Sequence, residues 1–281
     1  MPQIVNSISG LRNLLAPWRD RTIALVPTMG NLHAGHLALV QHARTLAERV
    51  VVSIFVNPLQ FGPSEDYAAY PRTLDLDSLK LAEERVDLLF APSPQEVYPR
   101  GREGLTTVTV PGLSDVLCGA TRPGHFSGVA TVVTLLFNLI QPHVAIFGEK
   151  DFQQLLVIRR LVADLHLPVE VVAYPTVRES DGLAMSSRNG YLSAEERKQA
   201  PLLYRSLCQM RDSLTAGRRD YERLEEECRR GLSASGFNPD YCTVRRAQDL
   251  VAPGEEDRQL VVLAATHLGR TRLIDNIQVI L

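Results

Sequence analysis

The sequence predicts an α/β protein in which a parallel sheet covered by helices is followed by a smaller α+β domain. Continuous apolar runs such as Val50–Val56 suit parallel strands that are buried on both faces. These runs alternate with stretches of helical spacing, which is typical of right-handed βαβ units. After residue 193 the sequence becomes charged and helical before short strands return. We therefore expect a Rossmann-like domain over residues 1–176 and a smaller α+β domain over residues 177–281.

Apolar periodicity and turn residues define the elements of the larger domain. A short helix is expected over residues 3–15, where Ile4, Ile8, Leu11 and Leu15 share one face. The other expected elements are strands at Thr22–Pro27, Val50–Val56, Val86–Pro92, Leu105–Val110, His143–Asp151 and Val169–Arg178, and helices near 34–48, 74–85, 127–140 and 152–165.

The smaller domain differs from the larger one in composition and in the order of its elements. Charged residues dominate two helical stretches, and short strands follow them. We expect these helices at Ala194–Thr215 and Asp220–Leu232, and the strands at Tyr241–Arg245, Leu260–Thr266 and Thr271–Gln278.

Composition excludes several classes of function. A chain of 281 residues, 45% of them hydrophobic, can bury a sizeable core, and its net charge of −2 gives no electrostatic reason to bind nucleic acid. No apolar run approaches the roughly 20 residues that span a bilayer, and no secretory signal pattern opens the chain. The four cysteines are scattered, so we expect reduced thiols, no zinc site and a cytoplasmic protein.

The stretch LVPTMGNLHAGHLALV (Leu25–Val40) carries the first functional signal, because a strand runs through a glycine turn into a helix. Ligands of open parallel sheets bind where strands end and helices begin. Gly30 and Gly35 let a base or phosphate approach the backbone, and the helix N-terminus favours phosphate. His33 and His36 are three residues apart and share one face, where imidazoles can stabilise developing charge. Metal ligation and an ordinary helix start are the competing interpretations.

Two other segments carry phosphate-directed groups. IFGEKD (Ile146–Asp151) again joins a strand to a helix through a glycine turn, and Lys150 would place an ammonium over phosphate there. Only three of the 30 basic residues are lysines, which makes a lysine at this turn notable. MSSRN (Met185–Asn189) combines two hydroxyls and an arginine near the predicted domain boundary, although taken alone it reads as a polar loop.

Neutral amides follow two of the strands. Gln60 and Gln154 can hydrogen-bond hydroxyls and a carboxylate without competing as nucleophiles, although either could be an ordinary surface residue. Asn57, Arg122 and His125 are weaker candidates for the same substrate site. Asp75 and Asp77 suit either Mg²⁺ or a solvated helix start.

These motifs together resemble one family. T-M-G-x-L-H-x-G-H is similar to the H-x-G-H motif of the nucleotidyltransferase superfamily, which class I aminoacyl-tRNA synthetases share. The chain as a whole resembles the pantothenate synthetase (pantoate–β-alanine ligase) family. The blocks that carry the resemblance are VPTMGNLHAGH, FVNPLQFG, YPRTLDLD, RPGHFSGV, FGEKDFQQ, MSSRNGYL and LIDN, the last at Leu273–Asn276.

The resemblance implies the roles of individual residues. His36 is the expected principal catalytic residue, and His33, Lys150 and Arg188 share the transition-state charge. Gln60 and Gln154 bind pantoate, and Gln60 also touches β-alanine. The implied ATP-binding residues are Met29, Gly30, Asn31, Leu32, His33, Ala34, Gly35, His36, Gly148, Glu149, Lys150, Asp151, Val177, Met185, Ser186, Ser187 and Arg188.

The implied reaction is an ATP-dependent ligation with Mg²⁺ on the phosphates. Pantoate and ATP would form pantoyl-adenylate and pyrophosphate, and β-alanine would then release AMP and pantothenate. The resemblance also implies a homodimer with small-molecule substrates, no nucleic acid and no membrane. Two alternatives stay open, a nucleotidylyltransferase that stops after nucleotidyl transfer and a nucleotide-binding regulatory protein without turnover.

Overall fold

The computed structural model describes residues 1–63 and 65–281, which form two compact units. The first unit comprises Met1–Glu149 and Val157–Pro175, and the second comprises Lys150–Leu156 and Thr176–Leu281. The short segment Lys150–Leu156 groups with the C-terminal residues.

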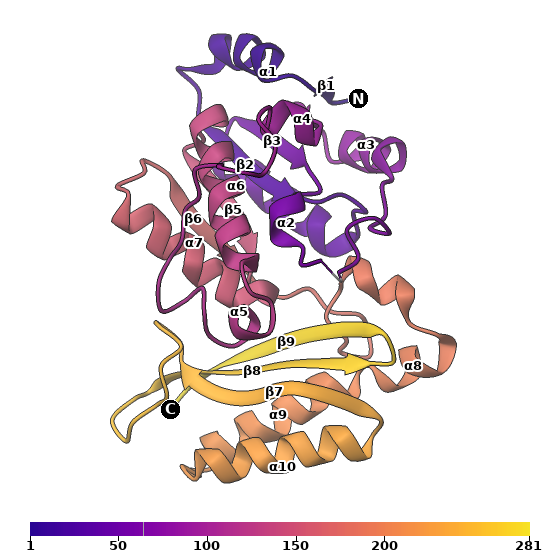
Figure 1. The fold of residues 1–281 in the computed structure, drawn as a ribbon, viewed down its shortest axis with the longest axis vertical. Helices are drawn as coiled ribbons and strands as arrows, with labels where there is room; N and C mark the ends of the chain where they lie inside the picture. Colours follow the sequence, from indigo (N-terminus) through magenta and orange to yellow (C-terminus); the bar gives the residue numbers. More distant parts are fainter. Residues whose placement is uncertain (64) are drawn as a thin grey trace. The chain divides into compact units, whose positions relative to one another are not determined.

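A six-stranded parallel sheet forms the centre of the first unit, with strand order β1-β4-β3-β2-β5-β6 (Figure 1). This arrangement confirms the predicted Rossmann-like α/β class. The strands are β1 (Gln3–Val5), β2 (Ile23–Thr28), β3 (Arg49–Ile54), β4 (Leu88–Phe90), β5 (Val144–Gly148) and β6 (Glu170–Tyr174). The helices and 3₁₀ turns are α1 (Ile8–Leu15), η1 (Ala16–Trp18), α2 (Ala34–Leu46), η2 (Pro58–Gln60), α3 (Leu74–Glu83), α4 (Pro94–Val97), α5 (Cys118–Thr121), α6 (His125–Ile140), η3 (Glu149–Asp151) and α7 (Phe152–Asp164).

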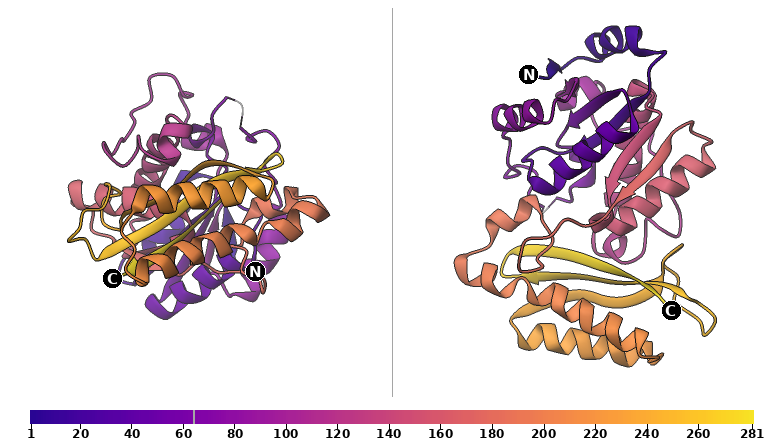
Figure 2. Two further views of the ribbon diagram at one scale, coloured as in Figure 1. Left: turned by 90° about the horizontal axis from the view of Figure 1, so that it is seen from below. Right: turned by 180° about the vertical axis from the view of Figure 1, so that it is seen from behind.

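Both faces of the inner strands β2, β3, β4 and β5 are largely buried, as their apolar sequences predict. Val26 and Val52 on one face pack in a cluster with Val40 of α2 and Leu81 of α3. Successive strand residues point to opposite faces, and Leu25 on the other face is also fully buried. Figure 2 shows the sheet between its flanking helices from behind. Because β2 is a central strand and runs parallel to its neighbours β3 and β5, the turn after it lies in the middle of the carboxyl edge of the sheet.

Two predicted elements of this unit are wrong. The predicted helix at residues 3–15 begins only at Ile8, because Ser7 caps it by accepting from the N–H of Gly10, and Gln3–Val5 instead pair with β4. The predicted strand at Leu105–Val110 has no regular structure. Its Val108 N–H donates to Thr131 Oγ1 of α6 at 2.9 Å, and the hydroxyl of Ser127, also on α6, donates to the Val108 carbonyl at 3.2 Å. Side chains of a helix thus take the bonds that a strand partner would need.

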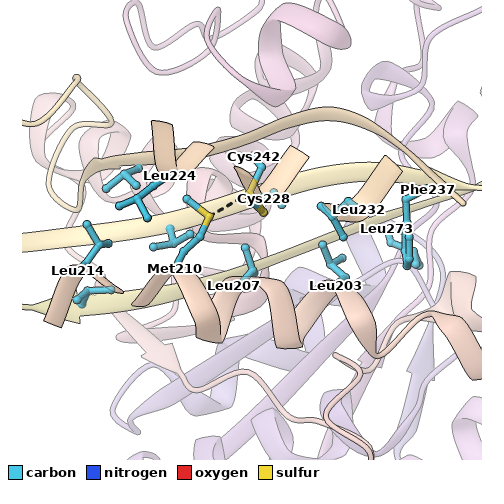
Figure 3. Packing of buried hydrophobic residues seen from close by; sticks show 14 of the residues in the cluster. Leu203, Leu207, Met210, Leu214, Leu224, Cys228, Leu232, Phe237, Cys242 and Leu273 are labelled. Atoms are coloured by element: carbon cyan, nitrogen blue, oxygen red, sulfur yellow. Dashed lines mark hydrogen bonds between the residues drawn. A yellow bond between two sulfur atoms is a disulfide. The ribbon is translucent and has the colours of Figure 1, made fainter. Parts of the chain in front are cut away.

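The second unit contains a three-stranded antiparallel sheet of order β7-β8-β9, with helices packed on it. The predicted α+β class of this part is therefore confirmed. Its core joins α9 and α10 to the sheet through residues such as Leu207, Leu232 and Leu273 (Figure 3). The elements are η4 (Ser187–Tyr191), α8 (Ala194–Gln199), α9 (Leu202–Thr215), α10 (Tyr221–Ala234), β7 (Phe237–Arg246), β8 (Gln259–Leu268) and β9 (Thr271–Ile280).

The cysteines differ from expectation. Cys228 of α10 and Cys242 of β7 form a disulfide, with their Cα atoms 6.5 Å apart, so the prediction of four reduced thiols is wrong for this pair. Cys118 and Cys208 are not disulfide-bonded and remain thiols. Cys242 Sγ also lies 3.3 Å from Met210 Sδ, a packing contact because a disulfide sulfur has no hydrogen to donate. The spacing of the two cysteines could not predict the pairing, which depends on how α10 packs on β7.

A helix that crosses a bilayer needs roughly 20 predominantly apolar residues. The most apolar helix, α6, has 16 residues and ends where Gln141 adopts a left-handed conformation. Across residues 1–63 and 65–281, no helix combines the length and apolarity needed to cross a bilayer.

Candidate active site

The turn between β2 and α2 contains two consecutive residues with positive φ, and the sequence places glycine and asparagine there. Gly30 has φ of +84°, and Asn31 follows with φ of 51°. A Cβ at Gly30 would lie 3.0 Å from Ile54 Cγ2 and 3.2 Å from Asp77 Oδ2, so a larger residue would be both strained and crowded. The turn therefore brings the backbone of residues 30–32 close to the sheet edge before α2 begins at Ala34.

His33 and His36 form a reciprocal capping box at the start of α2. His33 Nδ1 accepts from the N–H of Gly35 at 3.1 Å, and His36 Nδ1 accepts from the N–H of His33 at 3.3 Å. The ring centroids are 4.0 Å apart. Because each Nδ1 accepts, a neutral ring carries its proton on Nε2. Each imidazole can thus offer an Nε2–H donor to an anion beside the helix N-terminus.

Asp77 of α3 is the main residue of this turn whose role was not predicted from the sequence. Its carboxylate is fully buried and accepts from the N–H groups of Asn31 and Leu32, both at 2.8 Å, and from Thr73 Oγ1 at 3.1 Å. Lys80, one helical turn further on, donates to the carbonyl of Leu32 at 2.5 Å. Asp77 thus holds the turn, and its burial shows that a solvated helix start is the wrong interpretation for it. Asp75 is exposed, as a solvated helix start requires.

Asn57 fixes the orientation of the Gln60 side chain. The Asn57 amide is buried, and its Nδ2 donates to Gln60 Oε1 and to the Gly128 carbonyl, each at 3.1 Å. Its Oδ1 accepts from the Tyr98 hydroxyl at 2.9 Å and from the Leu59 N–H at 3.2 Å. If this amide were rotated by 180°, its NH₂ group would face the Leu59 N–H and its oxygen would face the Gly128 carbonyl. The hydrogen bonds therefore determine its orientation.

The consequence is that Gln60 presents its amide nitrogen. Gln60 Nε2 donates to Met29 Sδ at 3.0 Å. A thioether sulfur is a weak acceptor, so a carboxylate or hydroxyl oxygen in its place would form a stronger hydrogen bond. Burial raises the pKa of Tyr98, so its phenol stays protonated and continues to donate to Asn57. Tyr98 is a second residue that sequence reasoning missed, because nothing local links it to Gln60.

Arg122 and His125 support the main chain of the same segment. His125 Nδ1 lies 2.8 Å from the Gln60 carbonyl, which can only accept, so Nδ1 carries the proton and Nε2 accepts from Arg122 Nη1 at 3.0 Å. Arg122 also forms two hydrogen bonds with Glu65, at 2.6 and 2.7 Å. Burial tends to raise the pKa of Glu65, but the bonds and charge of Arg122 outweigh it, and the pKa is lowered. These contacts make both residues supports of Gln60.

The second unit contains Lys150, the middle residue of the 3₁₀ turn η3. Its side chain is largely buried, and its ammonium lies 3.7 Å from Asp151 Oδ2, a loose ion pair. The Lys150 carbonyl accepts from Asn276 Nδ2 at 2.9 Å. Gln154 lies in the first turn of α7 and is half-buried. Both candidates therefore belong to the short segment that groups with the C-terminal residues.

The segment from Val177 to Arg188 folds back on itself. The Val177 carbonyl accepts from the N–H of Met185 at 3.0 Å, and Arg178 pairs with Ala184 in an antiparallel bridge. Ser186 caps the following 3₁₀ turn by accepting from the N–H of Arg188 at 3.3 Å. The residue predicted to contact adenine and those predicted to contact phosphate thus lie at the two ends of one turn.

In the part of the chain that the structure describes, no three His, Cys, Asp or Glu side chains cluster as metal ligands. This finding gives no support to the interpretation of His33 and His36 as metal ligands. What the two units present is hydrogen-bond donors and cations: imidazole N–H groups, an amide, an ammonium and a guanidinium.

The parallel sheet, with an H-x-G-H turn after its strand β2, defines a Rossmann-like α/β protein. Within that class the chain belongs to the pantoate–β-alanine ligase family, whose family model matches residues 3–278. It is 60% identical over 279 residues to a pantothenate synthetase of Thioalkalivibrio sulfidiphilus, covering 99% of this chain and 98% of the relative. A pantothenate synthetase of Methylococcus capsulatus is 57% identical over 277 residues, covering 98% and 97% of the two chains.

Solved structures lead to the same family. The crystal structure of a pantothenate synthetase from Thermus thermophilus has a TM-score of 0.91 and 49% identity, covering 98% of each chain. A pantoate–β-alanine ligase from Francisella tularensis, complexed with β-γ ATP and β-alanine, has a TM-score of 0.82 and 33% identity, covering 99% and 97% of the two chains. The family and the fold that the sequence motifs predicted are therefore confirmed, and the chain is an enzyme of this family.

Proposed function

We propose that this enzyme makes pantothenate from pantoate, β-alanine and ATP through a pantoyl-adenylate intermediate. The observation that carries the proposal is the pair of imidazoles at the start of α2, whose Nδ1 atoms each accept a backbone N–H, so that a neutral ring carries its proton on Nε2. Donors fixed in this way suit charge that develops on phosphate. The related ligase of Francisella tularensis was crystallised with an ATP form and β-alanine, which supports ATP as the activating substrate here.

In the proposed first step, a pantoate carboxylate oxygen attacks the α-phosphorus of ATP. A bond forms between that oxygen and phosphorus, the bond to the β-phosphate oxygen breaks, and pyrophosphate leaves. In the second step the β-alanine amine attacks the acyl carbon, AMP leaves with the acyl oxygen, and the amine loses a proton as the amide forms. The reaction requires positioning and charge stabilisation more than covalent chemistry by the protein.

The residue roles follow from the groups that each segment presents. We assign His36 and His33 to the phosphate that is attacked, and Lys150 and Arg188 to the same developing charge. Ser186 and Ser187 bind phosphate, and Val177 contacts adenine through its backbone. Gln60 donates from Nε2 to a pantoate oxygen, and Gln154 is assigned to the same substrate.

Mg²⁺ is proposed to arrive with ATP on its phosphates. Asp77 is occupied by backbone donors, and Asp75 stands alone at an exposed helix start, so neither builds a protein cage. Mg²⁺ commonly keeps several waters and binds through substrate phosphates in such enzymes. The ion would then neutralise phosphate charge, and the protein's own donors would complete the environment.

Pyrophosphate exchange tests the proposed order of steps. Activation of the acid should precede, and not require, the amine. The enzyme should exchange labelled pyrophosphate into ATP when supplied with pantoate and Mg²⁺ but no β-alanine, and the exchange should vanish without pantoate. If exchange begins only when β-alanine is added, the separate adenylate step is wrong. Release of ADP and phosphate would instead indicate an acyl phosphate.

We predict that Asp77→Asn raises the KM for ATP by about tenfold. The amide nitrogen of asparagine cannot accept, so one of the two N–H groups of Asn31 and Leu32 loses its buried partner, and such a bond to a charged group contributes about 1.5–3 kcal/mol. Steady-state kinetics and thermal unfolding would measure the effect. Asp75→Asn, on the same helix but exposed, is the matched control and should equal the parent. Equal behaviour of the two variants would contradict the role of Asp77.

We predict that Tyr98→Phe raises the KM for pantoate by about fivefold and leaves the KM for ATP unchanged. Losing the phenol removes one net hydrogen bond of about 1 kcal/mol and frees the Asn57 amide to rotate away from Gln60. The control is Tyr221→Phe, because the buried Tyr221 hydroxyl makes no hydrogen bond to any described residue. An equal rise in both KM values would show a general loss of structure instead of a specific effect on Gln60.

The homodimer also remains a prediction. Sedimentation equilibrium at assay concentrations should give twice the mass of the chain, that is, two copies of 31.2 kDa. A mass of one chain across the same concentrations would contradict it.

A further inference from the structure

The LIDN segment of β9 is a block of the family resemblance that contributes no residue to the proposed chemistry. Leu273 and Asp275 lie on the face of β9 that packs toward α9 and α10, and Asn276 follows on the opposite face. Asn276 is buried, and its Nδ2 donates to the Lys150 carbonyl at 2.9 Å, across 126 residues of sequence. The segment thus reaches the main chain of a residue proposed to act on phosphate.

A buried ion pair holds Asn276 in place. The Arg178 guanidinium donates to both oxygens of Asp275, at 2.6 and 2.9 Å, and its central carbon lies 3.7 Å from the Tyr204 ring centre. Arg178 also donates to the Asn276 carbonyl at 3.4 Å, and the Asn276 N–H donates to Asp275 Oδ1 at 2.8 Å. Burial raises the pKa of Asp275, an effect that the charge of Arg178 opposes. The main chain of residues 275–276 is therefore fixed from both sides.

The same arginine fixes the turn that leads to Ser186 and Arg188. Arg178 donates to the Gly182 carbonyl at 3.2 Å and pairs with Ala184 through its backbone. One guanidinium therefore bonds both to the middle of β9 and to the turn that leads to Ser186 and Arg188. A buried ion pair is by itself weak support for stability, because desolvation offsets its attraction. Its direct contacts with both segments favour a positioning role.

We propose that Asn276, anchored by Arg178 and Asp275, is a positioning residue that sets the main chain of Lys150. A hydrogen bond to the Lys150 carbonyl restrains the peptide that follows Lys150, and with it the direction in which the side chain leaves the backbone. Displacement of a catalytic group by about 1 Å can cost about 10²-fold in rate. The inference rests on the proposed role of Lys150, and its test separates the two.

A double-mutant cycle tests the inference, with pantoate-dependent pyrophosphate exchange as the readout. Asn276→Ala should lower the exchange rate at saturating ATP by about tenfold or more in the parental background. In the Lys150→Ala background the same change should have almost no further effect, because the group it positions is gone. Asn276→Asp keeps the shape but loses the donor, and it should be at least as impaired as Asn276→Ala. Gln278→Ala, on the same face of β9 and exposed, is the matched control and should equal the parent.

Each other outcome overturns a specific statement. If Asn276→Ala lowers exchange by the same factor in both backgrounds, its effect does not pass through Lys150 and the inference is wrong. If Asn276→Asp retains parental exchange, the donor to the Lys150 carbonyl is unimportant and the inference is also wrong. If Lys150→Ala itself exchanges at the parental rate, the proposed role of Lys150 fails, and the inference falls with it. Thermal unfolding of each variant identifies any that fail to fold.

Discussion

His36→Ala should fold and lose most of its turnover, by about 10²–10³-fold, the cost typical of removing one fixed donor to a developing charge. The structure separates two functions of this ring. Its Nδ1 caps α2 by accepting from the N–H of His33, and its Nε2 is the donor assigned to phosphate. Loss of a cap costs about 1 kcal/mol of stability, so Ala alone confounds the two functions.

Asparagine and glutamine separate the cap from the donor. In His36→Asn, Oδ1 lies near the position of Nδ1 and can continue to accept from the helix, but nothing replaces Nε2–H. We therefore expect parental thermal stability with a loss of turnover close to that of alanine. In His36→Gln the amide nitrogen can reach the Nε2 position, so part of the turnover should return while the cap is lost.

His42 supplies the matched control for these variants. It lies on the same helix, two turns further on, and its ring contacts Tyr174 at 5.2 Å between centroids. His42→Asn should retain near-parental kcat with both substrates saturating. If His36→Asn also retained it, His36 would contribute only a helix cap, and the catalytic assignment would be wrong.

Most of the fold could be predicted because its signals are local. Apolar β-branched runs give the buried strands, and helical spacing gives the elements between them. The two failures in the first unit occur where a side chain takes over a backbone bond, at Ser7 before α1 and at Thr131 beside Val108. Apolar periodicity does not report such bonds, because the partner can lie far along the chain. In the second unit the helix predicted at Ala194–Thr215 is divided into α8 and α9, with Ala200 and Pro201 between them.

The candidate site shows the same division. His33 and His36 could be predicted as site residues because three-residue spacing at a helix start is a local pattern, and the structure brings their rings together. Asp77 lies 46 residues from Asn31, and Tyr98 lies 41 residues from Asn57, so their roles depend on sheet topology. For Asp77, the sequence signal was the pair of acidic residues at the start of α3. That signal suggested contact with solvent or a metal ion, whereas the Asp77 carboxylate accepts from backbone N–H groups.

Lys150→Arg should be clearly impaired, by about tenfold or more at saturating ATP, and Lys150→Ala by about 10²–10³-fold. Arginine keeps the charge, but its planar, longer fork replaces a compact ammonium that can sit over a single phosphate oxygen. The Lys150 side chain is only 19% exposed, and its carbonyl is held by Asn276, so the backbone has little freedom to accommodate a longer group.

Lys198→Arg is the matched control, because the chain has only three lysines and Lys198 is a surface residue. Its side chain is 71% exposed and pairs with Glu195, an exposed pair of little energetic value, so the change should leave kcat and both KM values at parental levels. Steady-state assays with ATP and pantoate saturating would make the comparison. Parental kcat in Lys150→Arg would show that only the positive charge matters at this turn. The compact ammonium geometry assigned to Lys150, and the need to position it through its main chain, would then both be wrong.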